Sequence, residues 1–174
     1  MHKLVLFDKD GTLINPKSGE RFVQSPEDQI LRPGVEAKLA RIHAAGTKMA
    51  IVSNQGGVAC GHKTLKEACD EMEYAMRLTG IMAGSFSPSH PDGEEMDMAR
   101  ISIYSSSHVD NPDVLDEDGI ECRKPGPGML LWSMNVFAME ASQTLFVGDR
   151  PEDERAAANA GVDFEWADNY FSAE

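Results

Sequence analysis

The chain has 174 residues, which is enough for one domain with a full hydrophobic core. Its formal net charge of -13 at pH 7 disfavours the broad basic surface of nucleic-acid-binding proteins, although small local basic patches are compatible with it. Three cysteines do not make a disulfide framework, and the sequence shows no signal peptide and no apolar run of membrane-spanning length. We therefore expect a single domain over residues 1–174 in the cytoplasm, with no membrane partner.

A short apolar segment that ends in two acids opens the chain. Leu4 to Phe7 is an uninterrupted apolar run, which is typical of a central parallel strand covered on both faces. Ligands of open α/β sheets bind beyond the carboxyl ends of such strands, so Asp8 and Asp10 are predicted to lie at a site. Two carboxylates about 4 Å apart repel by roughly 4 kcal/mol at an effective dielectric of about 20. Mg²⁺ would offset this repulsion, because it prefers carboxylate oxygens.

Two other interpretations fit part of this segment. An EF-hand loop also uses D-x-D-G, but aligning Asp8, Asp10 and Gly11 with it puts Leu6 and Lys17 where carboxylates are required. An ordinary acidic turn at a strand end is compatible with the local sequence. The local sequence therefore does not distinguish a ligand-binding site from an acidic turn, and the rest of the sequence is needed to choose between them.

The next part of the chain predicts a flap, a helix and a strand. Residues 14–34 are polar and turn-rich, and we expect them to lie as a flap over the end of the first strand. Apolar residues at i, i+4 and i+7 predict a helix over residues 33–45. The strand that follows, residues 49–52, again ends in a polar, glycine-bearing loop, residues 53–57.

A second helix and an irregular acidic region come next. Thr64 and Glu67 form a capping box that starts the helix, which ends at Gly80. Short strands are predicted near residues 85–87 and 101–104. An acidic loop from Val109 to Glu121 follows, and we expect it to be a solvated surface loop.

The last part of the chain repeats the alternation of helix and strand. Residues 123–128 open a third helix, and residues 144–147 form another buried strand that ends in residues 148–153. A helix from Pro151 to Gly161, a strand over residues 162–167 and a short tail complete the chain. This pattern predicts an α/β fold with a doubly wound parallel sheet.

Polar groups of complementary chemistry follow the predicted strands: Asp8 and Asp10, then Ser53, then Lys124, then Asp149 with Asp153. Each has an ordinary explanation on its own, such as a turn cap, a surface lysine or an acid favoured by a helix dipole. Together and in this order they favour a site for phosphoryl transfer, which needs a nucleophile and neutralisation of charge.

Each residue of this set has a chemical role in such a reaction. Asp8 can attack phosphorus and form an aspartyl-phosphate, while Asp10 can protonate the leaving oxygen and later activate water. Mg²⁺ held by Asp8 and Asp149 offsets the repulsion between nucleophile and phosphate. Ser53 and Lys124 can donate to the phosphoryl oxygens.

These segments resemble the four motifs of the haloacid-dehalogenase (HAD) superfamily: residues 8–12 (DKDGT), 53–55 (SNQ), 124–125 (KP) and 148–153 (GDRPED). The S-N-Q-G and C-R-K-P-x-P-G-M-L patterns are similar to a subfamily IIIA-like branch. That branch holds heptose-bisphosphate phosphatases, histidinol-phosphatases and polynucleotide-kinase 3′-phosphatase domains. The resemblance implies a Mg²⁺-dependent phosphatase.

The resemblance also implies residue roles. Asp8 would be the nucleophile, and Asp10 the general acid and base as well as a metal ligand through its backbone carbonyl. Asp149 would be the second direct carboxylate ligand, and Asp153 an outer-shell one. The same resemblance makes further residues candidates for contact with the substrate: Asn54, Arg123 and Arg150.

One departure from the family pattern concerns zinc. Heptose and histidinol members often carry C-x-H and C-x-C pairs that bind structural zinc, whereas this chain has Ser87, Ser89 and His90 at the first pair and only Cys122 near the second. One thiolate and one imidazole do not close a tetrahedral site, so structural zinc is not expected. The loops are also too short for an independent cap domain.

We therefore expect a phosphatase that acts on a small phosphorylated metabolite, such as a sugar bisphosphate. The alternative is a polynucleotide 3′-phosphatase. The net charge of -13 and the acidic loop from Val109 to Glu121 disfavour binding to a polynucleotide. A response-regulator receiver domain would carry its lysine last, whereas Lys124 precedes Asp149 here. An inactive binding module is excluded only by measured turnover, and the sequence does not determine the oligomeric state.

Overall fold

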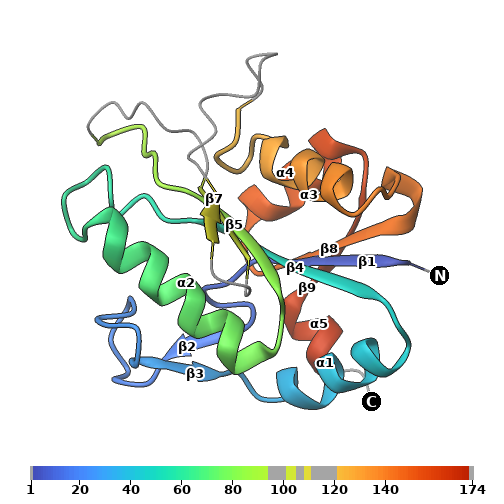
Figure 1. Cartoon of the computed structure of the whole chain (residues 1–174), viewed down its shortest axis with the longest axis horizontal. Coiled ribbons are helices and arrows are strands. Elements are labelled where there is room, and N and C mark those ends of the chain that lie inside the picture. The colour runs from blue at the N-terminus through green and yellow to red at the C-terminus, as the bar shows by residue number, and fades with distance from the viewer. Residues whose placement is uncertain (1, 94–100, 105–107, 111–120, 173–174) are drawn as a thin grey trace.

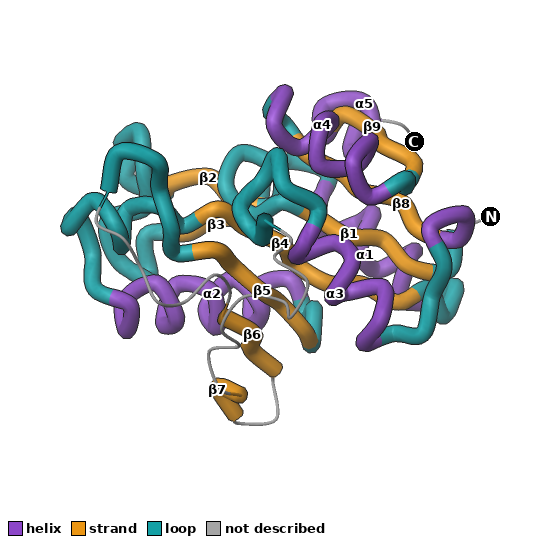
Figure 2. The backbone as a smooth tube through the Cα atoms, turned by 90° about the horizontal axis from the view of Figure 1, so that it is seen from above, coloured by secondary structure: helices purple, strands orange, loops and turns teal. Residues whose placement is uncertain are grey.

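The structure, a computed structural model, describes residues 2–93, 101–104, 108–110 and 121–172 (Figure 1). It contains a seven-stranded sheet in the order β7-β6-β5-β4-β1-β8-β9. The five parallel strands are β1 (Leu4–Phe7), β4 (Lys48–Asn54), β5 (Ala83–Ser87), β8 (Thr144–Gly148) and β9 (Asp163–Trp166). Figure 2 shows β6 (Ile101–Tyr104) and β7 (His108–Asp110) extending the sheet beyond β5. β6 pairs antiparallel with β5, and β7 pairs antiparallel with β6.

The central strand β1 carries the buried apolar run at the start of the chain. It pairs with β4 on one side and β8 on the other, so that Phe7 lies opposite Ile51 and Val147. All four of its side chains are buried, and they alternate between two separate apolar clusters on the two faces of the sheet. The absence of polar alternation therefore reflects a strand covered on both faces, as predicted.

Helices cover both faces of the sheet. Residues of α1 (Val35–Ala44), α2 (Leu65–Thr79) and α5 (Ala167–Ser172) pack with Phe7 in one cluster, and residues of α3 (Gly128–Val136) and α4 (Pro151–Ala160) pack with Leu6 in the other. In Figure 1, α3 and α4 lie above the strands, and α1 and α5 lie below them. The predicted doubly wound α/β fold is confirmed, with β6 and β7 added at one edge through antiparallel pairing.

Local signals in the sequence mark the helix ends correctly. Thr64 and Glu67 form the predicted capping box, with Glu67 N donating to Thr64 Oγ1 at 3.2 Å and Thr64 N donating to Glu67 Oε2 at 2.7 Å. Gly80 and Gly161 end α2 and α4 in the left-handed conformation, which glycine adopts without steric cost.

Four details add to the prediction or differ from it. The flap contains a two-stranded antiparallel hairpin, β2 (Ile14–Pro16) and β3 (Gln29–Leu31). The C-terminal tail is the helix α5, which packs Tyr170 against Phe7 with ring centroids 6.0 Å apart. In the predicted acidic loop, Val109 and Asp110 belong to β7, and residues 111–120 lie outside the described residues. A 3-10 helix, η1 (Ala141–Gln143), precedes β8.

None of the helices within the described ranges is both long and apolar enough to cross a membrane. That residues 1–174 form a single domain stays a prediction.

Candidate active site

The site forms where the carboxyl ends of adjacent parallel strands meet. Asp8 follows β1, Ser53 is the penultimate residue of β4, and Asp149 follows β8, and these three strands are neighbours in the sheet. Lys124 reaches the same edge from the loop before α3. The topology therefore brings together residues that the sequence separates widely.

The Lys124 side chain lies at the centre of the site. Its Nζ lies 2.5 Å from Asp8 Oδ1 and 2.7 Å from Asp153 Oδ1, and it donates to the carbonyl of Val52 at 3.2 Å. All three charged residues are buried. Burial by itself would lower the pKa of Lys124, but the carboxylates of Asp8 and Asp153 outweigh it and raise the pKa above its ordinary value. Lys124 is therefore a fixed cation, in contrast to the flexible surface lysine that the sequence alone allows.

Three acids lie close together at the site, and two of them contact this cation. Asp8, Asp149 and Asp153 each offer an oxygen within 4.8 Å of the others, and they are the only such group of three or more potential metal ligands among the described residues. Burial raises the pKa of Asp8 to about 8 despite Lys124, and burial together with Asp153 raises the pKa of Asp149. One ammonium thus leaves negative charge uncompensated, and the all-oxygen donor set fits a hard divalent cation such as Mg²⁺.

Asp153 differs from the other two acids in its partners. Its Oδ2 accepts hydrogen bonds from the backbone N–H groups of Asp149 and Arg150 at 3.2 and 3.1 Å, and its Oδ1 faces Lys124. Both oxygens are therefore engaged by the protein. This arrangement favours an outer-shell position for Asp153 and leaves Asp149, half-buried and in contact with Thr12 Oγ1 at 3.3 Å, as the more accessible carboxylate.

Gly11 lets the loop after β1 approach Asp149. Its φ of +84° lies in the left-handed region, and a Cβ at this position would overlap the Asp149 carboxylate. Both the conformation and the space therefore require glycine here.

The Asp10 carboxyl group is held by Lys9 and Gln55. Its Oδ1 lies 2.9 Å from Lys9 Nζ, and its Oδ2 accepts a hydrogen bond from Gln55 Nε2 at 2.8 Å. Partial burial would raise the pKa of Asp10, but Lys9 and Gln55 outweigh it and lower the pKa below its ordinary value. Sequence analysis did not single out either partner, although Lys9 stands between the two acids and Gln55 within the motif after β4.

Ser53 and Asn54 continue the same loop. Ser53 is buried, and its Oγ accepts from Gln55 Nε2 at 2.9 Å, so its own O–H remains a donor for a ligand oxygen. The amide of Asn54 binds the peptide groups of Lys124. The predicted contact between Asn54 and the substrate stays a prediction.

The two arginines lie at the border of the site. Arg123 donates to the carbonyl of Ser89 at 2.7 Å, and its half-buried position lowers its pKa. Arg150 is exposed, with Nε 3.9 Å from Asp149 Oδ2 and Nη1 3.7 Å from Glu152 Oε1. Arg150 therefore borders the three acids through Asp149, whereas Arg123 contacts the loop that carries Ser89. The predicted contacts of both arginines with the substrate stay predictions.

Comparisons with known proteins agree with this geometry. The family described as polynucleotide kinase 3 phosphatase matches residues 3–174. The D-glycero-beta-D-manno-heptose-1,7-bisphosphate 7-phosphatase of Bordetella bronchiseptica is 31% identical over 162 residues, which cover 91% of this chain and 76% of the relative. The enzyme of the same name from Haemophilus influenzae is 28% identical over 162 residues, covering 93% and 79%.

A solved structure gives the same result. The D,D-heptose 1.7-bisphosphate phosphatase from B. bronchiseptica, complexed with magnesium and phosphate, superposes with a TM-score of 0.69 at 26% identity, covering 93% of this chain and 78% of that one. The fold and the converging acids, serine and lysine define a phosphatase of the HAD superfamily. More particularly, the chain belongs to the polynucleotide kinase 3 phosphatase family. The resemblance found in the sequence is confirmed.

Proposed function

We propose that this phosphatase depends on Mg²⁺ and hydrolyses a small phosphorylated metabolite, such as a sugar bisphosphate, through an aspartyl-phosphate. The observation that carries the proposal is the buried Lys124 ammonium, which contacts Asp8 at 2.5 Å beside the carboxylate of Asp149. The heptose-bisphosphate phosphatases among its relatives support the substrate class. The magnesium and phosphate in the related crystal structure support the metal.

In the first step, an oxygen of Asp8 attacks phosphorus while the bond from phosphorus to the leaving oxygen breaks. In this proposal Asp10, ionised in the free protein, takes up a proton when the anionic substrate binds and transfers it to the leaving oxygen. Lys124 holds Asp8 in place and, with Ser53, donates to the phosphoryl oxygens. Asp10 then removes a proton from water, which attacks phosphorus and regenerates Asp8 with release of phosphate.

The metal ligands in this proposal are Asp8, Asp149 and the backbone carbonyl of Asp10, with Asp153 in the outer shell. When bound, Mg²⁺ would neutralise charge on the nucleophile and the phosphoryl group. Asp153 organises the loop after β8 through the two backbone N–H groups that it accepts.

A polynucleotide 3′-phosphatase is the second candidate, and the family description favours it. The net charge of -13 opposes it, because binding to a strand relies on Lys and Arg that neutralise several phosphates. Each such contact adds roughly 0.7 to the salt slope on a single strand, so a polynucleotide substrate would make the reaction strongly salt-dependent.

Kinetics on a panel of substrates test the proposal. We would measure kcat/KM with Mg²⁺ on sugar mono- and bisphosphates, nucleotides and a 3′-phosphorylated oligonucleotide, at low and high salt. An Asp8→Asn preparation provides the background rate. We expect a sugar bisphosphate to give the highest value. A kcat/KM for the oligonucleotide far above that for every small ester, falling steeply with salt, would overturn this preference.

A further inference from the structure

A closed ring of side chains lies on the side of Asp10 that faces α2. Lys9 Nζ lies 2.9 Å from Asp10 Oδ1 and 3.8 Å from Glu71 Oε2. In the other direction, Gln55 Nε2 donates to Asp10 Oδ2 at 2.8 Å, and Gln55 Oε1 accepts from Lys63 Nζ at 3.5 Å. Lys63 Nζ closes the ring by donating to the two carboxylate oxygens of Glu71 at 2.8 and 2.6 Å.

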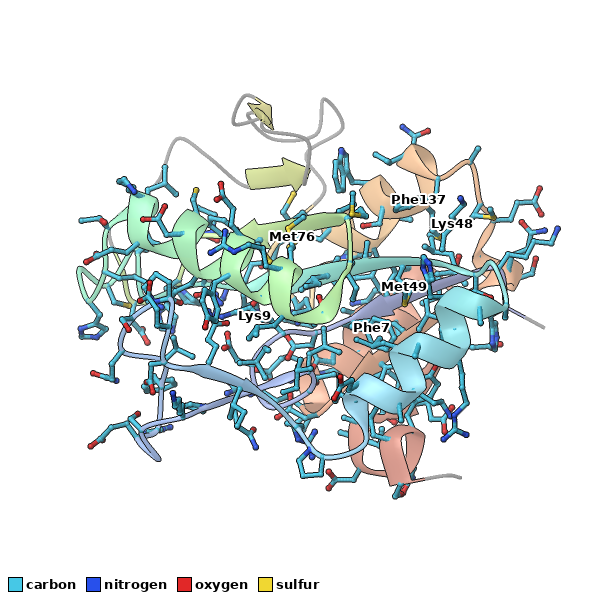
Figure 3. The ribbon with its side chains drawn as sticks, turned by 60° about the horizontal axis from the view of Figure 1, so that its bottom comes forward. Phe7, Lys9, Lys48, Met49, Met76 and Phe137 are labelled. Carbon is cyan, nitrogen blue, oxygen red and sulfur yellow. The ribbon has the colours of Figure 1, made fainter. Side chains whose placement is uncertain are left out.

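Because the charged members of the ring are buried, each depends on its neighbours in the ring to compensate its charge. Lys9 is 0% exposed and Glu71 3% exposed, which is unusual for charged residues and is tolerated only when they are paired. Two ammonium groups balance two carboxylates, and Glu71 is the ring member that contacts both ammonium groups. Figure 3 shows Lys9 between α2 and the β2–β3 hairpin, where its Nζ also reaches Gln29 Oε1 at 3.5 Å.

We propose that Glu71 is a positioning residue for Asp10: through Lys9 on one side and Lys63 with Gln55 on the other, it fixes both oxygens of the Asp10 carboxyl group. The inference rests on the proposed function, in which Asp10 protonates the leaving oxygen. A general acid has to lie within hydrogen-bond reach of that oxygen, and a displacement of about 1 Å can cost about 10²-fold in rate. The side chain of Asp10 is 37% exposed, so packing alone does not hold its orientation.

If the ring only anchored α2 to the sheet, a substitution that breaks it would have different effects on stability and activity. Loss of the ring would lower stability, or lower activity on every phosphate ester to the same extent. A positioning role instead changes how the rate depends on the leaving group. An alkoxide needs a proton as it departs, whereas p-nitrophenolate is a good leaving group without one.

The test compares Glu71→Gln with Glu73→Gln. Glu73 lies on the same helix, and its side chain is 47% exposed and 3.9 Å from Arg77 Nη1, so its loss should change neither stability nor kinetics. For each variant we would measure kcat/KM with Mg²⁺ on a primary alkyl phosphate and on p-nitrophenyl phosphate. This parameter covers the steps up to departure of the leaving group, so hydrolysis of the aspartyl-phosphate does not enter.

We expect Glu71→Gln to lower kcat/KM on the alkyl phosphate by about 10- to 100-fold, a part of the roughly 10²–10⁴-fold that a general acid contributes. On p-nitrophenyl phosphate the change should stay below about threefold, because no proton transfer is lost there. In an Asp10→Asn background, Glu71→Gln should have no further effect on the alkyl phosphate.

Each outcome decides between the proposals. If the Glu71→Gln variant folds and its kcat/KM falls equally on both esters, or on neither, the positioning role is overturned. If Glu71→Gln does not fold, Lys63→Gln takes its place, because the Lys63 side chain is 18% exposed and its loss disturbs the interior less. If the ratio of kcat/KM on the alkyl phosphate to kcat/KM on p-nitrophenyl phosphate is unchanged in Lys63→Gln, the inference is likewise overturned. A wild-type protein that hydrolyses neither these two esters nor any phosphate ester of the substrate panel overturns the proposed function itself, and with it this inference.

Discussion

The side-chain amide of Asn54 forms two hydrogen bonds with the peptide groups of Lys124. Asn54 Nδ2 donates to the carbonyl of Lys124 at 2.9 Å, and Asn54 Oδ1 accepts from Lys124 N at 3.0 Å. The end of β4 thereby fixes the backbone of the loop before α3, from which the lysine side chain reaches Asp8. Asn54 therefore positions the backbone of Lys124, a role that the family resemblance did not suggest.

Replacing Asn54 by Ala should therefore disturb Lys124. We expect a loss of about 1–3 kcal/mol in the free energy of unfolding for the polar groups left unpaired, and at least about a tenfold lower kcat. Chemical denaturation and steady-state kinetics measure both effects. Asn159→Ala is the matched control, because Asn159 donates to Pro125 O of the same loop at 2.9 Å from an exposed position. Equal effects of the two variants would contradict the special role of Asn54.

Asp8→Asn should abolish turnover and leave the fold intact. The amide has the same shape as the carboxylate but is a poor nucleophile, so we expect activity on a phosphate ester to fall by on the order of 10³-fold or more. Circular dichroism and the Tm verify that the variant is folded. Substantial residual activity in the presence of Mg²⁺ would rule out the covalent mechanism.

Mg²⁺ should stabilise the folded protein through Asp149. A ligand that binds only the native state adds about 2.7 kcal/mol at a concentration of 100 times its Kd, which raises the Tm by several degrees. A chelator should remove both this stabilisation and the activity, reversibly. In Asp149→Asn most of the Tm shift should disappear. Asp163→Asn should keep it, because Asp163 is exposed and pairs with His2 at 2.7 Å. Identical shifts in the two variants would exclude Asp149 as a ligand.

Gly11→Ala should weaken the metal site. The left-handed conformation by itself costs an L-residue roughly 1–2 kcal/mol, and the added Cβ would in addition displace the Asp149 carboxylate. Gly19→Ala separates the two effects, because Gly19 has a similar φ of +80° but no atom within 4 Å of a Cβ built there. Both variants should lose stability, measured by denaturation, and only Gly11→Ala should lose its Tm response to Mg²⁺. A normal response in Gly11→Ala would show that the close approach to Asp149 is dispensable.

The protein should fold without zinc. At the positions where the family resemblance would place zinc ligands, Ser87 Oγ and Ser89 Oγ hydrogen-bond to each other at 2.9 Å, and Cys122 is 5% exposed within an apolar cluster. Elemental analysis of protein purified without added metal should find no stoichiometric zinc, and a zinc chelator should leave the Tm unchanged. Zinc at one equivalent that is lost together with the fold would contradict this prediction.

Local patterns in the sequence were sufficient for the elements that define the fold. The apolar run of β1, the capping box at Thr64 and the glycines after α2 and α4 act within a few residues, so they are readable without the structure. The same holds for Asp8, Ser53 and Asp149 as candidates, because parallel strands deliver their carboxyl ends to one edge of the sheet.

The tertiary structure alone decided which side chains meet. Lys9 looks like a solvated residue between two acids, yet it is completely buried because Glu71 and Asp10 compensate its charge from two sides. Asp10 is bound to Lys9 and Gln55, while Lys124 pairs with Asp8 and Asp153. Such pairings depend on how helices pack against the sheet, and no periodicity or turn signal encodes them. The sequence therefore determined which chemical groups reach the site. Only the packing of α2, α4 and the loop before α3 at this edge of the sheet determined which of them act together.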